Sequence, residues 1–215
     1  MVQHDIPPGK MLLHFSPRSP YVRKVMIAAH EMGLAERLHC VRTVVGGTTP
    51  HVELMRENPL GKIPTLVLAD GTIYYDSPVV CEYLDTLHQG PKLFPPAWPA
   101  RGTALRRLAL GDGMLDAALP WLGERFRPAE KQSQPHIDLW RGKLVAAVDH
   151  LEGEAAALAR DPFSIGHIAI GVALAYLDFR FAELEWRKGH PALADWHAGF
   201  NARPAVQANP VVDDR

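Results

Sequence analysis

The sequence has few cysteines, no excess of either charge and no recognisable metal motif. Its only two cysteines, Cys40 and Cys81, are too few for a disulfide framework or a four-thiolate zinc site, and we interpret both as small buried residues in a reducing compartment. The 23 basic and 24 acidic residues leave a formal charge of -1, which argues against a nucleic-acid binder with a broad basic face. The 11 histidines are scattered and form no H-E-x-x-H pair, so we expect no metal site.

Secretion and membrane signals are also missing from the sequence. Residues 1–8 lack a basic end followed by an apolar run, and the longest apolar stretch, residues 168–177, has about half the length of a membrane span. We therefore expect a cytoplasmic protein with no membrane contact. The composition, 47% hydrophobic and 22% charged, is typical of a packed globular chain.

The first half of the chain predicts a small domain in which strands and helices alternate. Asp70-Gly71 is a hairpin signal between two short apolar runs, and Ser77-Pro78 is a helix start with serine as the N-cap. The predicted elements are a lead-in (1–10), a strand (11–15), a helix (20–33), a strand (38–45), a short helix (51–57), two strands (63–68 and 72–75) and a helix (77–88).

The second half predicts helices only. A proline-marked linker over residues 90–100 separates the halves, so we expect one domain over 11–89 and another over 101–215. The helical periodicity predicts a long helix around 108–126 and further helices over 137–158, 164–184 and 191–200. The predicted helix over 164–184 is apolar nearly all round, as expected for the central helix of a helical domain.

Four local motifs, in order, resemble the cytosolic glutathione transferases, and the likeness covers nearly the whole chain after the lead-in. They are Ser16–Lys24, Asn58–Leu66, Asp76-Ser77 and the late segments 168–180 and 191–204. The N-terminal motif is similar to bacterial, serine-type, omega-, zeta- or theta-like members. The resemblance implies a thioredoxin-like α/β domain that binds glutathione, followed by an all-helical domain.

The resemblance also implies that a hydroxyl at the first helix stabilises the glutathione thiolate. Ser19 directly precedes Pro20-Tyr21, where Cys-type members carry their cysteine, and Ser16 matches the hydroxyl position of zeta-like members. We favour Ser19 as the catalytic residue, with Ser16 as the alternative, and expect the other serine to serve only as a helix cap. A cysteine is absent from position 19, which argues against mixed-disulfide chemistry.

Two further segments are expected to hold the rest of the glutathione molecule. Ile63-Pro64 resembles the family's cis-proline pair, whose preceding backbone binds the cysteinyl part, and Lys62 or, more weakly, His51 is a candidate partner of the glycine carboxylate. The plain alternative is that Lys62 and His51 are surface residues.

The γ-glutamyl end is expected at the start of the helix that begins near residue 77. By the resemblance, Ser77 receives the carboxylate at a helix N-terminus and Asp76 pairs with the amine.

The chain departs from the family's pattern at the central helix, where many relatives have a Ser/Thr-x-x-Asp box. Here Ser164 is followed by His167, which cannot act as the acidic partner unless a different contact substitutes for it.

These expectations support a glutathione transferase that adds the thiolate to a small hydrophobic electrophile, with glutathione as co-substrate and no metal. A non-catalytic glutathione-binding or regulatory protein on the same fold is the alternative, as is a glutathione-dependent isomerase or dehalogenase. By the resemblance, the partners are a small-molecule electrophile and a second copy of the chain in a homodimer. Asp112, on the apolar stripe of the long helix, lines the cleft, reaches the glutathione of a neighbouring subunit or makes a structural hydrogen bond to the backbone.

Overall fold

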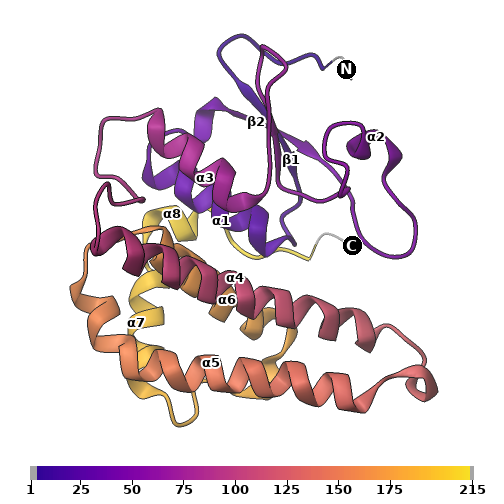
Figure 1. Ribbon diagram of the computed structural model, residues 1–215, viewed down its shortest axis with the longest axis vertical. Coiled ribbons are helices and arrows are strands. Elements are labelled where there is room, and N and C mark those ends of the chain that lie inside the picture. Colours follow the sequence, from indigo (N-terminus) through magenta and orange to yellow (C-terminus); the bar gives the residue numbers. More distant parts are fainter. Residues whose placement is uncertain (1–3, 214–215) are drawn as a thin grey trace. The chain divides into compact units, whose positions relative to one another are not determined.

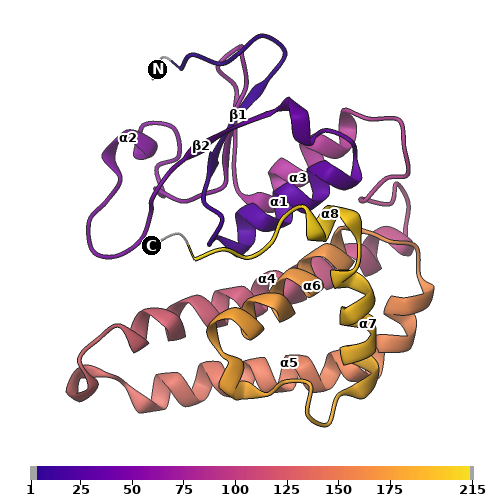
Figure 2. The ribbon, with the colours of Figure 1, turned by 180° about the vertical axis from the view of Figure 1, so that it is seen from behind.

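The structure, a computed structural model, describes residues 4–213 of the chain (Figures 1 and 2). The chain divides into two compact units. The first contains the chain up to Phe94 together with the segment from Ala208 onward, and the second contains Pro95–Gln207. The first unit is built from strands and helices and the second from helices, so the predicted fold class is confirmed.

A four-stranded mixed sheet forms the centre of the first unit, with strand order β2-β1-β3-β4. Strand β1 pairs parallel with β2 and antiparallel with β3, and β4 is antiparallel to β3. The strands are β1 (Met11–Phe15), β2 (Leu38–Arg42), β3 (Thr65–Val67) and β4 (Ile73–Tyr74), and the helices are α1 (Pro20–Glu31), a 3-10 turn (Ala35–Arg37), α2 (Val52–Met55) and α3 (Ser77–Thr86). Helices α1 and α3 pack against each other, as Figure 1 shows.

Three predicted strands are shorter in the structure, and two of them, β2 and β3, are shorter for identifiable reasons. Strand β2 ends at Arg42 because its neighbour β1 ends at Phe15, whose carbonyl accepts the last hydrogen bond from the Thr43 N–H, at 2.8 Å. Strand β3 begins only at Thr65 because Pro64 has no N–H to donate to a neighbouring strand. The hydrophobic pattern extends beyond the paired segment in both cases.

The second unit contains four long helices, and one of them, α6, is buried along most of its length. The helices are α4 (Ala100–Arg125), a 3-10 turn (Ala129–Lys131), α5 (Gln134–Arg160), α6 (Ile165–Arg180), a 3-10 turn (Ala182–Leu184), α7 (Pro191–Asn201) and α8 (Pro204–Gln207). Helices α4 and α6 approach closely at two glycines: a Cβ on Gly111 would lie 2.5 Å from the carbonyl carbon of Ala169, and one on Gly166 would lie 2.6 Å from the Cβ of Arg107. Between residues 4 and 213, no helix combines the length and the apolar character that a bilayer span requires.

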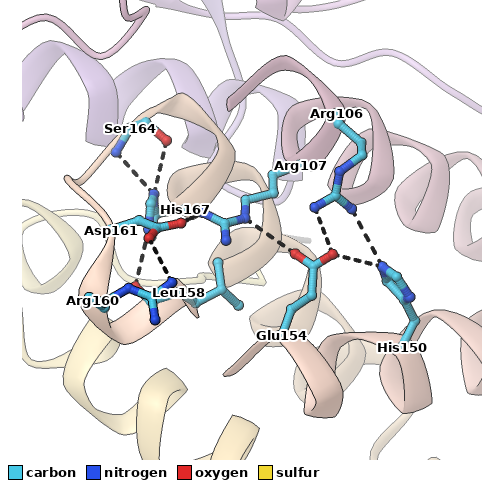
Figure 3. A network of polar contacts seen from close by, with 9 residues as sticks. All are labelled: Arg106, Arg107, His150, Glu154, Leu158, Arg160, Asp161, Ser164 and His167. Carbon is cyan, nitrogen blue, oxygen red and sulfur yellow. Dashed lines mark hydrogen bonds and ion pairs between the residues drawn. The ribbon is translucent and has the colours of Figure 1, made fainter. Parts of the chain in front are cut away.

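The first turn of α6 corrects the expectation for His167. Its ring Nδ1 accepts a hydrogen bond from the backbone N–H of Ser164 at 3.0 Å (Figure 3). The Ser164 side chain accepts a hydrogen bond from the backbone of His167. A complete capping box is therefore present, with an imidazole nitrogen in place of the carboxylate oxygen. The contact that substitutes for the acidic partner is the hydrogen bond accepted by the unprotonated ring nitrogen of His167.

Candidate functional site

The two candidate serines lie between the end of β1 and the start of α1. Ser16 is buried, and its carbonyl accepts a hydrogen bond from the Ser19 N–H at 3.1 Å. Ser19 is half-buried and is the N-cap of α1, where its Oγ accepts from the backbone N–H of Val22 at 3.3 Å. An oxygen that accepts a capping bond keeps its own O–H proton, so Ser19 can still donate to a ligand at the positive end of the helix.

The Ile63–Pro64 peptide bond is cis, as the sequence predicts, and a buried asparagine holds the loop in front of it. Asn58 donates from Nδ2 to the carbonyl of Lys62 at 3.0 Å and to Oγ1 of Thr65 at 3.1 Å. Its Oδ1 accepts from the N–H of Leu60 at 3.1 Å. Asn58 lies within the Asn58–Leu66 motif, where the sequence alone indicates no role for it, and these three hydrogen bonds position the cis-proline loop.

The two candidates for the glycine carboxylate differ in their surroundings. Lys62 has an exposed side chain next to the cis pair, so its ammonium group is accessible to a ligand. His51 is the N-cap of the short helix α2, and its Nδ1 accepts from the N–H of Leu54 at 3.1 Å. The structure thus gives His51 a capping contact that the sequence did not predict.

At the start of α3 the structure moves the predicted N-cap by one position. Asp76 is the N-cap, with an exposed side chain that makes no capping bond, and Ser77 is the first residue of the helix. Ser77 is 0% exposed, and its Oγ has no hydrogen-bond partner. An unpartnered buried hydroxyl is costly and calls for an explanation, and here it lies at a helix N-terminus that favours anions.

The sheet register brings these three segments to one end of the sheet. His14 on β1 lies opposite Thr65 on β3, so continuing the antiparallel ladder places Ser16 beside Ile63. Leu66 pairs with Tyr74 on β4, so the same continuation leads from β4 toward Asp76. The α1 entrance, the cis-proline loop and the α3 entrance therefore lie at this end of the sheet, which brings together a hydroxyl, the backbone of Ile63 and a helix N-terminus.

Comparison with family models identifies both halves of the chain. Residues 18–87 match the N-terminal domain of glutathione S-transferase, and residues 134–199 match the C-terminal domain of glutathione S-transferase. Among curated proteins, the uncharacterized GST-like protein YibF of Escherichia coli is 33% identical over 186 residues, which is 85% of this chain and 90% of that protein. Glutathione S-transferase 2 of Saccharomyces cerevisiae is 24% identical over 92% of this chain and 88% of its own length.

Solved structures agree with these matches over almost the whole chain. A glutathione transferase family member from Pseudomonas fluorescens Pf-5, solved with bound glutathione, is 40% identical with a TM-score of 0.91, and the match covers 95% of this chain and 100% of that one. A glutathione S-transferase from Methylobacillus flagellatus, also solved with glutathione, is 32% identical with a TM-score of 0.87, over 94% of this chain and 100% of that one. The chain belongs to the glutathione S-transferase family.

Proposed function

We propose that this protein is a glutathione transferase. It binds glutathione at the end of the sheet where the α1 entrance, the cis-proline loop and the α3 entrance meet, and it activates the glutathione thiol. The observation that carries the proposal is the buried, unpartnered Oγ of Ser77 at the N-terminus of α3. A carboxylate bound there would accept hydrogen bonds both from that hydroxyl and from the free N–H groups of the first helical turn. The neighbouring Asp76, with its exposed carboxylate, would pair with the γ-glutamyl amine.

The remaining contacts follow from the cis-proline loop. The backbone of Ile63 would bind the cysteinyl part of glutathione, and Lys62 would attract the glycine carboxylate through an exposed point charge. His51 is the weaker candidate for that carboxylate because one of its ring nitrogens already caps α2. The two structures of relatives solved with glutathione support a ligand of this kind.

Glutathione supplies the sulfur nucleophile, and the protein's part is to favour the thiolate. A free thiol has a pKa near ~8.5, so lowering it by about two units corresponds to roughly 2.7 kcal/mol of preferential thiolate stabilisation. A hydroxyl hydrogen bond and the positive end of α1 would together provide it. We assign the donor to Ser19, whose half-exposed hydroxyl is more accessible than that of the buried Ser16. The thiolate would then form a carbon–sulfur bond with a small hydrophobic electrophile, and the leaving group would depart with its electron pair.

Titrating the ultraviolet thiolate band of bound glutathione tests the proposal. We expect the apparent pKa of the bound thiol to lie below the free value, and Ser19→Gly to return it toward that value. Glycine is a suitable replacement because it costs an N-cap only a few tenths of a kcal/mol, so α1 is retained while the hydroxyl is lost. Ser16→Ala serves as the comparison.

The same measurements separate the proposed enzyme from the alternatives. Glutathione that binds with an unshifted thiol pKa and supports no conjugation of an aryl halide would indicate a non-catalytic binding protein. A shift abolished by Ser16→Ala but not by Ser19→Gly would reassign the donor. Turnover without conjugation, detected by screening haloalkanes and isomerisable substrates, would indicate a dehalogenase or isomerase.

A further inference from the structure

Three side chains with metal-binding groups come together in the first unit, outside the proposed glutathione contacts. His14 lies on β1, Glu57 follows α2, and His4 lies in the segment before β1. One ligand atom from each residue lies within 4.8 Å of the other two. His14 and Glu57 are only 6% and 8% exposed, and they are separated by 43 positions in the sequence.

The hydrogen bonds around His14 determine which of its two ring nitrogens carries the proton. The Oγ1 of Thr43 lies 3.1 Å from the Val41 carbonyl, to which it donates, and 2.8 Å from Nδ1 of His14. Because a threonine hydroxyl has one proton, Nδ1 of His14 must then be the donor to Thr43. The other ring nitrogen, Nε2, is left as an acceptor, 2.7 Å from the carboxylate oxygen Oε2 of Glu57.

Two acceptors at this distance need a cation between them, either a proton or a metal ion. The second carboxylate oxygen of Glu57 contacts Nε2 of His4, so the same carboxylate faces two imidazoles. Neutral imidazole is the form that binds a metal ion.

We propose that His4, His14 and Glu57 form a binding site for a divalent transition metal ion of the Zn²⁺ type. Two imidazole nitrogens and one carboxylate oxygen are a ligand set that Zn²⁺ accepts, at about 2.0–2.2 Å from the ion, with the fourth position left for water or an anion. Thr43 acts as a positioning residue because its bond to Nδ1 orients the His14 ring and directs Nε2 toward the ion.

The place of the cluster in the fold gives the ion a consequence for neighbouring segments. His14 is two positions before Ser16, and Glu57 directly precedes Asn58, which holds the cis-proline loop. An ion shared by both would connect the end of β1 to the segment that follows α2. The proposal does not depend on glutathione binding, and its test uses the metal ion alone.

Short-range spacing in the sequence does not reveal this cluster. The H-E-x-x-H pattern brings ligands together on one helix. Here the ligands come from three separate segments, the stretch before β1, β1 itself and the residues that follow α2, so only the folded chain places them side by side.

The test measures binding of Co²⁺ and Zn²⁺ to the full chain, without a histidine tag, stripped with chelator and free of glutathione. We expect one ion per chain by native mass spectrometry, a tetrahedral Co²⁺ absorption spectrum, and displacement of Co²⁺ by Zn²⁺. His4→Ala and Glu57→Gln should each weaken Zn²⁺ binding at least about tenfold, and Thr43→Val about 10- to 100-fold. His39→Ala, a histidine on the neighbouring strand β2, is the matched control and should leave affinity unchanged.

Two outcomes would overturn the site. One is the absence of any bound ion in the unmodified protein, which would make the cluster a proton-mediated hydrogen-bond network. The other is an ion whose affinity is unchanged by His4→Ala and Glu57→Gln, which would place it elsewhere. Circular dichroism checks that each variant is folded, and His4→Ala, in the segment before β1, keeps the test decisive if Glu57→Gln fails to fold.

Discussion

The Nε2 atom of His167 lies 3.2 Å from the carbonyl oxygen of Leu158 and donates its proton to it. This contact agrees with the capping bond at the other ring nitrogen, because Nδ1 accepts from the N–H of Ser164 and therefore carries no proton. The ring is thus neutral and fixed in one tautomer. Burial, helped by the positive charge of Arg107, lowers the pKa of His167 from 6.5 to about 4.

The first prediction is that His167 makes stability fall as the pH falls. The unfolded chain protonates this histidine near pH 6.5, whereas the folded chain does so only near pH 4, so its contribution is complete above pH 6.5 and is lost between these values. At pH 5 the loss amounts to about 2 kcal/mol relative to pH 7.5. Because other groups also titrate, the measurement is the difference between the unmodified chain and His167→Gln in urea unfolding at both pH values.

His167→Gln is the appropriate variant because glutamine at the third helical position also completes a capping box, without titrating. The unmodified chain should lose about 2 kcal/mol more than the variant on going from pH 7.5 to pH 5. Equal losses in the two proteins would contradict the assigned neutral tautomer.

The second prediction compares two adjacent arginines that both contact Glu154 (Figure 3). The side chain of Arg107 is 3% exposed and also pairs with Asp161 at 3.0 Å, whereas the side chain of Arg106 is 51% exposed. Removing a buried partner leaves charges uncompensated, while an exposed ion pair contributes little. Arg107→Met should therefore lower the free energy of unfolding by about 2–4 kcal/mol, and Arg106→Met by less than about 1 kcal/mol.

Chemical denaturation at low and high salt measures both effects. The small loss in Arg106→Met should shrink further in salt, because exposed charges are screened, and the loss in Arg107→Met should persist. A similar loss in the two variants would show that burial does not distinguish these arginines.

Much of the fold was predictable from local sequence signals. Gly33 ends α1 as expected: its φ is +69°, and the following Leu34 N–H bonds back to the carbonyl of Ala29 at 2.7 Å. The Asp70-Gly71 hairpin is likewise confirmed by the antiparallel pair β3–β4. Three of the predicted strands extend beyond the observed ones. Hydrophobic alternation indicates which residues are buried, whereas hydrogen-bonded strand pairing also needs a partner strand that reaches far enough.

The candidate site was less accessible to sequence reasoning, because it depends on unpaired groups and long-range contacts. The motif containing Asn58 was visible, but its bonds to Lys62 and Thr65 exist only once the loop has folded. Ser77 was predicted as a capping residue, and only the structure shows that its hydroxyl lacks a partner. The His4–His14–Glu57 cluster carried no signal at all in local spacing.

The third prediction concerns Ser77→Ala, which should separate ligand affinity from stability. Because the Ser77 hydroxyl has no partner, its removal should leave the free energy of unfolding unchanged or slightly raised. A hydrogen bond to a charged group is worth about 1.5–3 kcal/mol, so glutathione affinity should fall about 10- to 100-fold. Calorimetric titration and urea unfolding measure the two quantities.

Ser133→Ala, at the N-cap of α5 in the second unit, is the control for this comparison. It should leave glutathione affinity unchanged. If Ser77→Ala destabilised the chain without weakening glutathione, the hydroxyl would have a structural role and the proposed carboxylate contact would be wrong.

The fourth prediction uses two glycines of α4 that differ in their surroundings. A Cβ on Gly111 would lie 2.5 Å from the backbone of Ala169 on α6, and backbone cannot move aside as a flexible side chain can. Gly111→Ala should therefore force the two helices apart and destabilise the chain by about 1–3 kcal/mol. Gly113, two positions later, has nothing within 4 Å of its Cβ position, so Gly113→Ala should stabilise the chain by up to about 1 kcal/mol through helix propensity. Thermal and urea unfolding of the two variants should shift in opposite directions, and a shift in the same direction would contradict the close approach of α4 to α6.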